Sequence, residues 1–107
     1  MNDLLKKICQ KKRDDLEKTK DKCSLLSLKK LLPNKKNRGF KNLLQLSQQN
    51  KKNNIIAEIK KESPSVGEII KDYSPEKIAV QYEKSSAGAI SILTENYFFK
   101  GHVDHLS

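Results

Sequence analysis

Glu58 and Lys60 bring a carboxylate and an ammonium group into the otherwise apolar run 55–60. Side chains alternate along a β-strand, so these two would share one face, with Cα atoms roughly 7 Å apart. Charges on an apolar strand are costly unless they pair, bind a ligand or reach water, and parallel strands place ligands at their carboxyl ends. The spacing predicts a functional pair, with an exposed ion pair on an edge strand as the alternative.

Ser63, Pro64, Ser65 and Gly67 form a small polar loop directly after this run. Hydroxyl and backbone groups in such a loop can bind a phosphate, although the same pattern also occurs in turns that bind nothing. The chain contains neither a P-loop pattern nor the GxGxxG pattern of dinucleotide-binding folds. The sequence therefore predicts no nucleotide cofactor.

Tyr97, Phe98 and Phe99 are half of the six aromatic residues in the chain, and they follow a second apolar run at 89–93. Two interpretations are open at this point. The rings either pack the loop against neighbouring helices or form an apolar wall for a flat ligand.

Four residues of metal-binding type are too scattered to predict a metal site. His102 and His105 stand three apart with no third ligand nearby. Cys9 and Cys23 are 14 positions apart and form no CxxC pattern, which favours free thiols in a reducing compartment. The sequence also offers no Ser-His-Asp or Cys-His set for nucleophilic catalysis.

Strands and helices in alternation must position these residues. The runs 55–59 and 89–93 predict strands, the first buried on most of its length, followed by loops at 61–73 and 94–101. With a helix between the strands and another beginning near Val103, this is the βα alternation of an α/β fold with a parallel sheet and a right-handed crossover. Two parallel strands cannot cover their own edges, so we expect the chain to be the beginning of something longer.

The helix between the two strands has a typical start. Ser74 is the expected cap, Pro75 the first helical residue and Glu76 an acid in the first turn. The helix would run to about Ser86, with Gly88 as its stop.

The spacing of apolar residues before the first strand predicts three helices, over 3–20, 24–32 and 40–50. Asn2 or Asp3 is the expected cap of the first helix, and Pro33 stops the second. We divide the chain into an N-terminal helical extension, 1–53, and the first βαβ portion of a larger fold, 54–107.

The charge follows this division. The chain has 107 residues and a net charge of +9; positions 1–53 carry 16 basic and 5 acidic residues (+11), and positions 54–107 carry 6 and 8 (−2). A basic arm can bind nucleic acid, but its lysines alternate with acids and no stacking aromatics stand among them. The pattern favours a solvated helix face. Three interpretations of the whole chain are therefore compared: part of an enzyme, a small basic binding protein, and the product of a truncated gene.

The apolar runs are all far shorter than the roughly 20 residues of a membrane span, and the N-terminus has no signal-type apolar region. We expect a cytoplasmic protein without a membrane partner.

The segment 55–65, IIAEIKKESPS, resembles the signature segment of the indole-3-glycerol phosphate synthase family. The resemblance continues through residues 72–75 and 79–83, then SILTE at 91–95 and FFKG at 98–101. It extends to the lysine-rich leader and to Arg38-Gly39-Phe40. Glu62 departs from the family pattern, which usually has a small or basic residue at this position.

The resemblance implies a (β/α)8 TIM barrel preceded by a helical extension. This chain would supply the extension, strand 1, helix 1, strand 2 and the start of helix 2. The implied reaction is the decarboxylating ring closure of 1-(2-carboxyphenylamino)-1-deoxyribulose 5-phosphate to indole-3-glycerol phosphate, a lyase reaction of tryptophan biosynthesis that uses no cofactor. The implied partner is a phosphorylated small molecule, and fusion or association with other tryptophan-pathway enzymes is left open.

The resemblance also implies roles for four residues. Glu58 and Lys60 would be catalytic: Lys60 would contact the anionic substrate and donate a proton, and Glu58 would hydrogen-bond the substrate. Ser63 would lie near the phosphate end of the substrate, and Phe99 would line the anthranilate pocket. A further lysine on strand 3, a glutamate on strand 4 and the phosphate-binding loops fall outside these 107 residues, so we expect this polypeptide to be inactive by itself.

Overall fold

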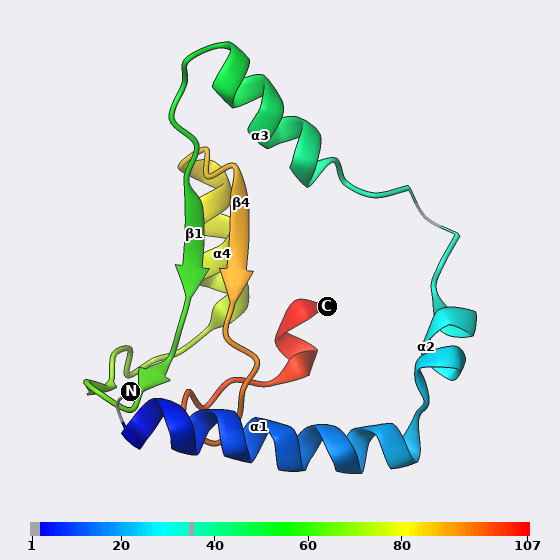
Figure 1. Ribbon diagram of the computed structural model, residues 1–107. Helices are drawn as coiled ribbons and strands as arrows, with labels where there is room; N and C mark the ends of the chain where they lie inside the picture. Colours follow the sequence, from blue (N-terminus) through cyan, green and yellow to red (C-terminus); the bar gives the residue numbers. More distant parts are fainter. Residues whose placement is uncertain (1–2, 35) are drawn as a thin grey trace. The chain divides into compact units, whose positions relative to one another are not determined.

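A parallel pair of strands, β1 (Ile56–Ile59) and β4 (Ala89–Ile92), is the centre of the βαβ unit in the computed structural model of the protein (Figure 1). The structure describes residues 3–34 and 36–107. Helix α4 (Pro75–Lys84) forms the crossover between the two strands and packs on β1. This confirms the α/β fold class and the predicted strand, helix, strand order.

One face of the strand pair packs on α4 and the other stays open. Ile59 points to the packed face and is 2% exposed, whereas Ile56 on the opposite face is 53% exposed. The prediction of a strand buried on most of its length is therefore wrong for this chain. Burial needs covering elements on both faces, and among the described residues α4 covers one.

The loop predicted at 61–73 contains a small antiparallel hairpin. Its strands are β2 (Glu62–Ser63) and β3 (Gly67–Glu68), and the N–H of Ile69 donates to the carbonyl of Lys61 over 2.9 Å. Gly67 has φ +80°, a left-handed conformation that favours glycine, so the turn depends on this residue.

Helix α4 begins as predicted, with Pro75 in the first turn after the cap Ser74, but it ends at Lys84. Gly88 lies beyond the helix and does not stop it. A Cβ at Gly88 would come within 1.7 Å of the side-chain oxygen of Asn54, so glycine permits a close approach there. The last element is the 3₁₀-helix η1 (Val103–Leu106), at the position predicted for the next helix.

In the described residues before the first strand there are three helices, close to their predicted bounds: α1 (Asp3–Lys22), α2 (Leu25–Leu31) and α3 (Phe40–Gln49). Asp3 lies in the first turn of α1, and the alternative cap, Asn2, lies outside the described residues. Ser24 caps α2 by accepting the N–H of Ser27.

The chain divides into two compact units, residues 1–36 and 37–107. The predicted boundary after residue 53 separates the helical extension from the βαβ portion of a larger fold, and it stays a prediction. No helix within residues 3–34 and 36–107 has the length and hydropathy of a membrane span.

Candidate functional site

Glu58 and Lys60 form an ion pair on the open face of β1, as their spacing predicts. The Lys60 Nζ lies 2.9 Å from the Glu58 Oε1, and the side chains are 34% and 49% exposed, respectively. Ile59, between them, points to the opposite side of the strand and is buried. A pair this open to water contributes only about 0–1 kcal/mol to stability, so stability alone is a weak reason for two charges on this strand.

The next lysine, Lys61, lies in a different environment. Its Nζ is 6.0 Å from the ring centroid of Tyr73, at cation–π distance. The two adjacent lysines therefore have different partners, and only Lys60 pairs with Glu58.

The register of the strand pair adds a hydroxyl to this face. Glu58 is paired with Ser91, and residues paired in a parallel register project to the same side of a sheet. The N–H of Leu93 donates to the carbonyl of Ile59 over 3.0 Å, so the pairing extends to the carboxyl ends of both strands. Sequence reasoning gave Ser91 no role, because register between two strands cannot be obtained from either strand alone.

Tyr82 fixes the backbone beneath the pair. Its Oη, from the second half of α4, donates a 2.9 Å hydrogen bond to the carbonyl oxygen of Glu58. The contact joins residues 24 positions apart, so it depends on how α4 packs on β1.

Ser63 lies in β2 and is 7% exposed. Its Oγ accepts the N–H of Val66 over 3.3 Å and lies 3.4 Å from the Oγ of Ser65. The hydroxyl therefore closes the turn of the hairpin in this structure. The contact with Val66 supports the interpretation of the Ser-Pro-Ser pattern as a turn. Ser63 also follows Lys60 by only three residues.

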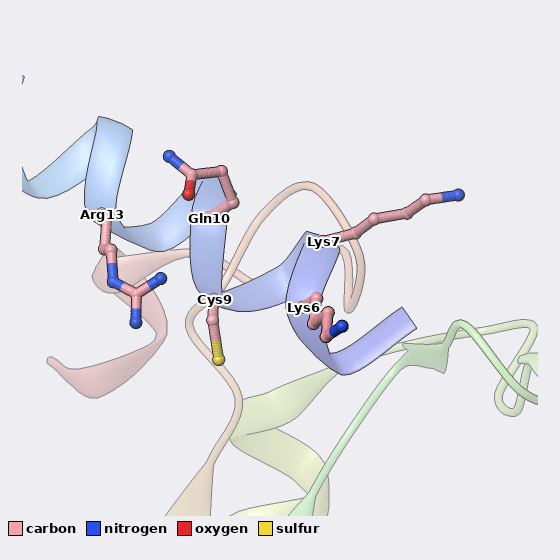
Figure 2. A pocket seen from close by; sticks show the side chains of 5 residues that line it. All are labelled: Lys6, Lys7, Cys9, Gln10 and Arg13. Atoms are coloured by element: carbon pink, nitrogen blue, oxygen red, sulfur yellow. The ribbon is translucent and has the colours of Figure 1, made fainter. Parts of the chain in front are cut away.

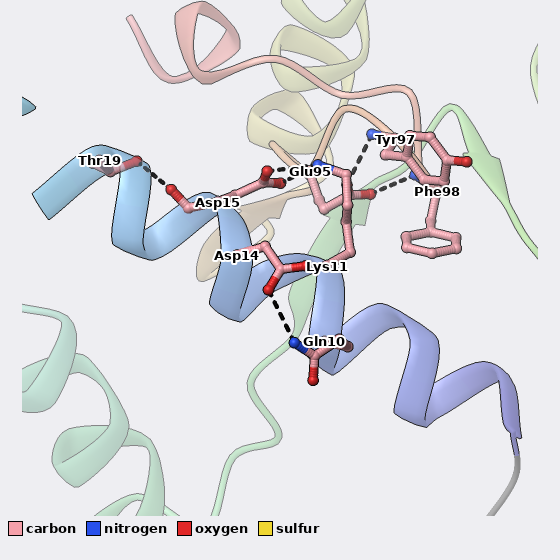
Figure 3. A network of polar contacts seen from close by, with 8 residues as sticks. All are labelled: Gln10, Lys11, Asp14, Asp15, Thr19, Glu95, Tyr97 and Phe98. Atoms are coloured by element: carbon pink, nitrogen blue, oxygen red, sulfur yellow. Dashed lines mark hydrogen bonds and ion pairs between the residues drawn. The ribbon is translucent and has the colours of Figure 1, made fainter. Parts of the chain in front are cut away.

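The loop after β4 is organised by Glu95. Its Oε1 accepts the N–H of Tyr97, and its Oε2 accepts those of Phe98 and Phe99, at 2.8, 2.7 and 3.1 Å, respectively; Figure 3 shows the first two contacts. The rings of Tyr97 and Phe98 meet edge to face with centroids 4.8 Å apart. Phe99 is half-buried. Sequence reasoning gave Glu95 no role, although an acid two to four residues before exposed N–H groups is a recognisable capping signal.

Tyr73, Glu76 and His105 form a second polar cluster, near the start of α4. The rings of Tyr73 and His105 lie 5.7 Å apart, and burial, followed by the charge of Glu76, raises the pKa of Tyr73. The pKa of Glu76 is lowered, first by its own backbone N–H and then by the Ser74 hydroxyl. These interactions stabilise the first turn of the helix.

Comparisons with known proteins decide the family. A sequence profile described as indole-3-glycerol phosphate synthase matches residues 5–107. The chain belongs to the indole-3-glycerol phosphate synthase family. Its relatives include the indole-3-glycerol phosphate synthase of Aliarcobacter butzleri, 41% identical over 106 residues, and those of Campylobacter jejuni subsp. doylei and Campylobacter fetus subsp. fetus, 41% and 39% identical over 104 residues.

Each of these alignments covers 97% of this chain, and the chain spans about 40% of the length of the curated relatives it matches. The resemblance identified from residues 55–65 is thereby confirmed. Within the (β/α)8 barrel of this family, β1, α4 and β4 correspond to the first strand, first helix and second strand.

Two further groups of residues lie in the N-terminal part of the chain. The side chains of Lys6, Lys7, Cys9, Gln10 and Arg13 line a hollow of about 440 Å³ on α1 (Figure 2). Cys9 and Cys23 are free thiols. Within the described residues, no group of three or more histidine, cysteine or acidic side chains could hold a metal ion.

Proposed function

We propose that the protein is an indole-3-glycerol phosphate synthase. It would convert 1-(2-carboxyphenylamino)-1-deoxyribulose 5-phosphate to indole-3-glycerol phosphate, CO2 and water. The observation that carries the proposal is the Glu58–Lys60 pair, because its members stand at the carboxyl end of the first barrel strand, where barrels of this kind place their active sites.

The reaction joins the ring carbon that carries the carboxylate to the ketone carbon. The carboxylate then leaves as CO2, and the former ketone oxygen leaves as water. A protonated amine suits the first step, because it can donate a proton to the ketone oxygen. After regaining a proton from solvent it can donate again to the departing hydroxyl, while the carbon next to the nitrogen gives up a proton to solvent. We assign this role to Lys60.

Glu58 would hold the Lys60 ammonium in place and hydrogen-bond the substrate. The ion pair supports the first part of this assignment, since the 2.9 Å contact orients the Lys60 Nζ on the open face. Ser63 and Phe99 would contact the phosphate end and the anthranilate ring, respectively. For Ser63 the contact would use the O–H donor, while the oxygen can keep accepting the Val66 N–H; the contact to be given up is the 3.4 Å one with the Ser65 Oγ.

The remaining features of the proposal concern the whole protein. The partner is a phosphorylated small molecule, and no cofactor takes part. We place the enzyme in the cytoplasm, where Cys9 and Cys23 stay reduced. Association with other enzymes of tryptophan biosynthesis is compatible with this assignment.

The test is to express the complete reading frame and to follow formation of the indole product from the substrate. We expect Lys60→Ala to lower kcat by about 10²-fold or more, the range for loss of a general acid. Glu58→Gln should lower kcat by less, because the ammonium group remains. Lys84→Gln removes a lysine from the last turn of α4 and is the matched control. A protein without turnover, or a Lys60→Ala variant as active as Lys84→Gln, would contradict the proposal.

A further inference from the structure

The loop after β4 is held by one carboxylate at three successive N–H groups. The acceptor is Glu95, and the donors are Tyr97, Phe98 and Phe99. Hydrogen bonds to a charged acceptor are about twice as strong as neutral ones, so this set fixes the backbone of the loop well. Figure 3 shows the Glu95 side chain turned back toward the chain that follows it.

The main chain of Glu95 closes the same loop. Its carbonyl accepts the N–H of Gly101 over 2.8 Å. Gly101 is buried, and a Cβ there would lie 1.9 Å from the carbonyl oxygen of Leu93, so the chain returns directly onto the end of β4. Side chain and main chain together make Glu95 the anchor of residues 94–101.

The loop is also tied to the proposed catalytic pair. Leu93, the residue directly after β4, donates its N–H to the carbonyl of Ile59, which lies between Glu58 and Lys60. A backbone fixed by Glu95 is therefore fixed relative to β1 as well. The half-buried Phe99 is the last of the three residues whose N–H groups the carboxylate holds.

We infer that Glu95 is a positioning residue of the proposed site. It holds the backbone of Phe99 so that the ring presents a flat apolar wall to the aromatic ring of the substrate. This inference rests on the proposed function and deepens it, because it identifies the residue that organises the aromatic part of the site. Glu95 itself contacts the loop and takes no part in proton transfer.

The experiment compares Glu95→Ala and Glu95→Gln in the protein expressed from its complete reading frame. If the Phe99 ring binds the substrate and the transition state with equal strength, displacing the ring raises KM and leaves kcat nearly unchanged. We expect Glu95→Ala to raise KM by about tenfold or more, with kcat within about threefold of wild type. Glu95→Gln keeps one acceptor oxygen and should show a smaller rise in KM.

Two further measurements separate positioning from a purely structural role. The near-ultraviolet circular dichroism of the Tyr97–Phe98 edge-to-face pair should weaken in Glu95→Ala and recover in part in Glu95→Gln. Glu83→Gln, an exposed carboxylate change on α4, is the control and should leave both KM and the dichroism unchanged. Glu95→Gln also keeps the test informative if Glu95→Ala fails to fold.

The outcomes are distinguishable. If the wild-type protein forms no indole product, the proposed function fails and this inference fails with it. If the wild type is active and both Glu95 variants keep its KM, or lose kcat alone, the inference is overturned and the proposed function stands.

Discussion

At the scale of single residues, little of the chain is buried, so packing alone holds few side chains in place. Specific polar contacts fix the groups near the site instead. Tyr82 fixes the Glu58 carbonyl, Glu95 fixes the aromatic loop, and Ser63 closes the hairpin turn. The charged pair alone contributes little to stability, so its geometry depends on these neighbouring contacts.

Glu76 gives a residue-scale prediction for pH. Its pKa is lowered below the ordinary glutamate value of about 4.3 by its own N–H and by the Ser74 hydroxyl. A depressed pKa in the folded state means that the stabilisation is complete above pH of about 4.3 and is lost as the pH falls through the lowered pKa. We therefore expect Glu76→Gln to be less stable than wild type at pH 7, with the difference shrinking toward pH 3.

The free energy of unfolding in urea, measured for both proteins at several pH values, checks this prediction. Glu83→Gln controls for the loss of one negative charge from α4. A difference between wild type and Glu76→Gln that is equally large at pH 3 and pH 7 would contradict the assignment.

At the scale of secondary structure, the hairpin β2–β3 contains an unfavourable pair. Its register places Glu62 opposite Glu68, and like charges directly opposite each other destabilise a sheet. Glu62 is also the residue at which the segment 55–65 departs from the signature that it resembles.

We predict that Glu62→Lys stabilises the protein by roughly 0.2–1 kcal/mol, the range for a cross-strand charge pair. Glu62→Gln should give part of that gain, because it removes the repulsion without adding an attraction. Both gains should shrink at 1 M salt, where the screening length is about 3 Å. Urea unfolding at low and high salt measures these effects, and a Glu62→Lys protein no more stable than wild type at low salt would argue against the like-charge contact.

The elements also show what the sequence can and cannot predict. Apolar spacing and capping residues located α1 to α4, β1 and β4 to within a few residues, because those signals are local. The hairpin at Glu62–Glu68 was missed because its strands have two residues each and no apolar alternation. The role of Gly88 was misjudged because its close approach to Asn54 joins distant parts of the chain.

The residues of the candidate site also differ in whether a local signal in the sequence could predict them. Alternation along one strand was enough to pair Glu58 with Lys60. Ser91 and Tyr82 reach the same strand through sheet register and helix packing, which are non-local. Glu95 was the one missed residue with a local signal, since its carboxylate caps the N–H groups two to four positions later.

At the scale of the whole molecule, the distribution of charge separates the two parts of the chain. Two of the lysines on α1 form ion pairs along the helix: Lys11 with Asp15 and Lys20 with Glu17. Figure 3 shows the first of these pairs. Such pairing is typical of a solvated helix face.

The last prediction concerns what these 107 residues can do by themselves. The chain spans about 40% of the length of its relatives, and the face of β1 that bears Glu58 and Lys60 is open to water. In water the effective dielectric is high and a charged pair has little influence on a developing charge, whereas an enclosed site strengthens the same interaction severalfold. We therefore expect a polypeptide of residues 1–107 to form no indole-3-glycerol phosphate, even with Lys60 and Glu58 intact. The full-length Aliarcobacter butzleri synthase, assayed alongside, is the positive control. Turnover by residues 1–107, abolished by Lys60→Ala, would mean that the pair needs no further enclosure.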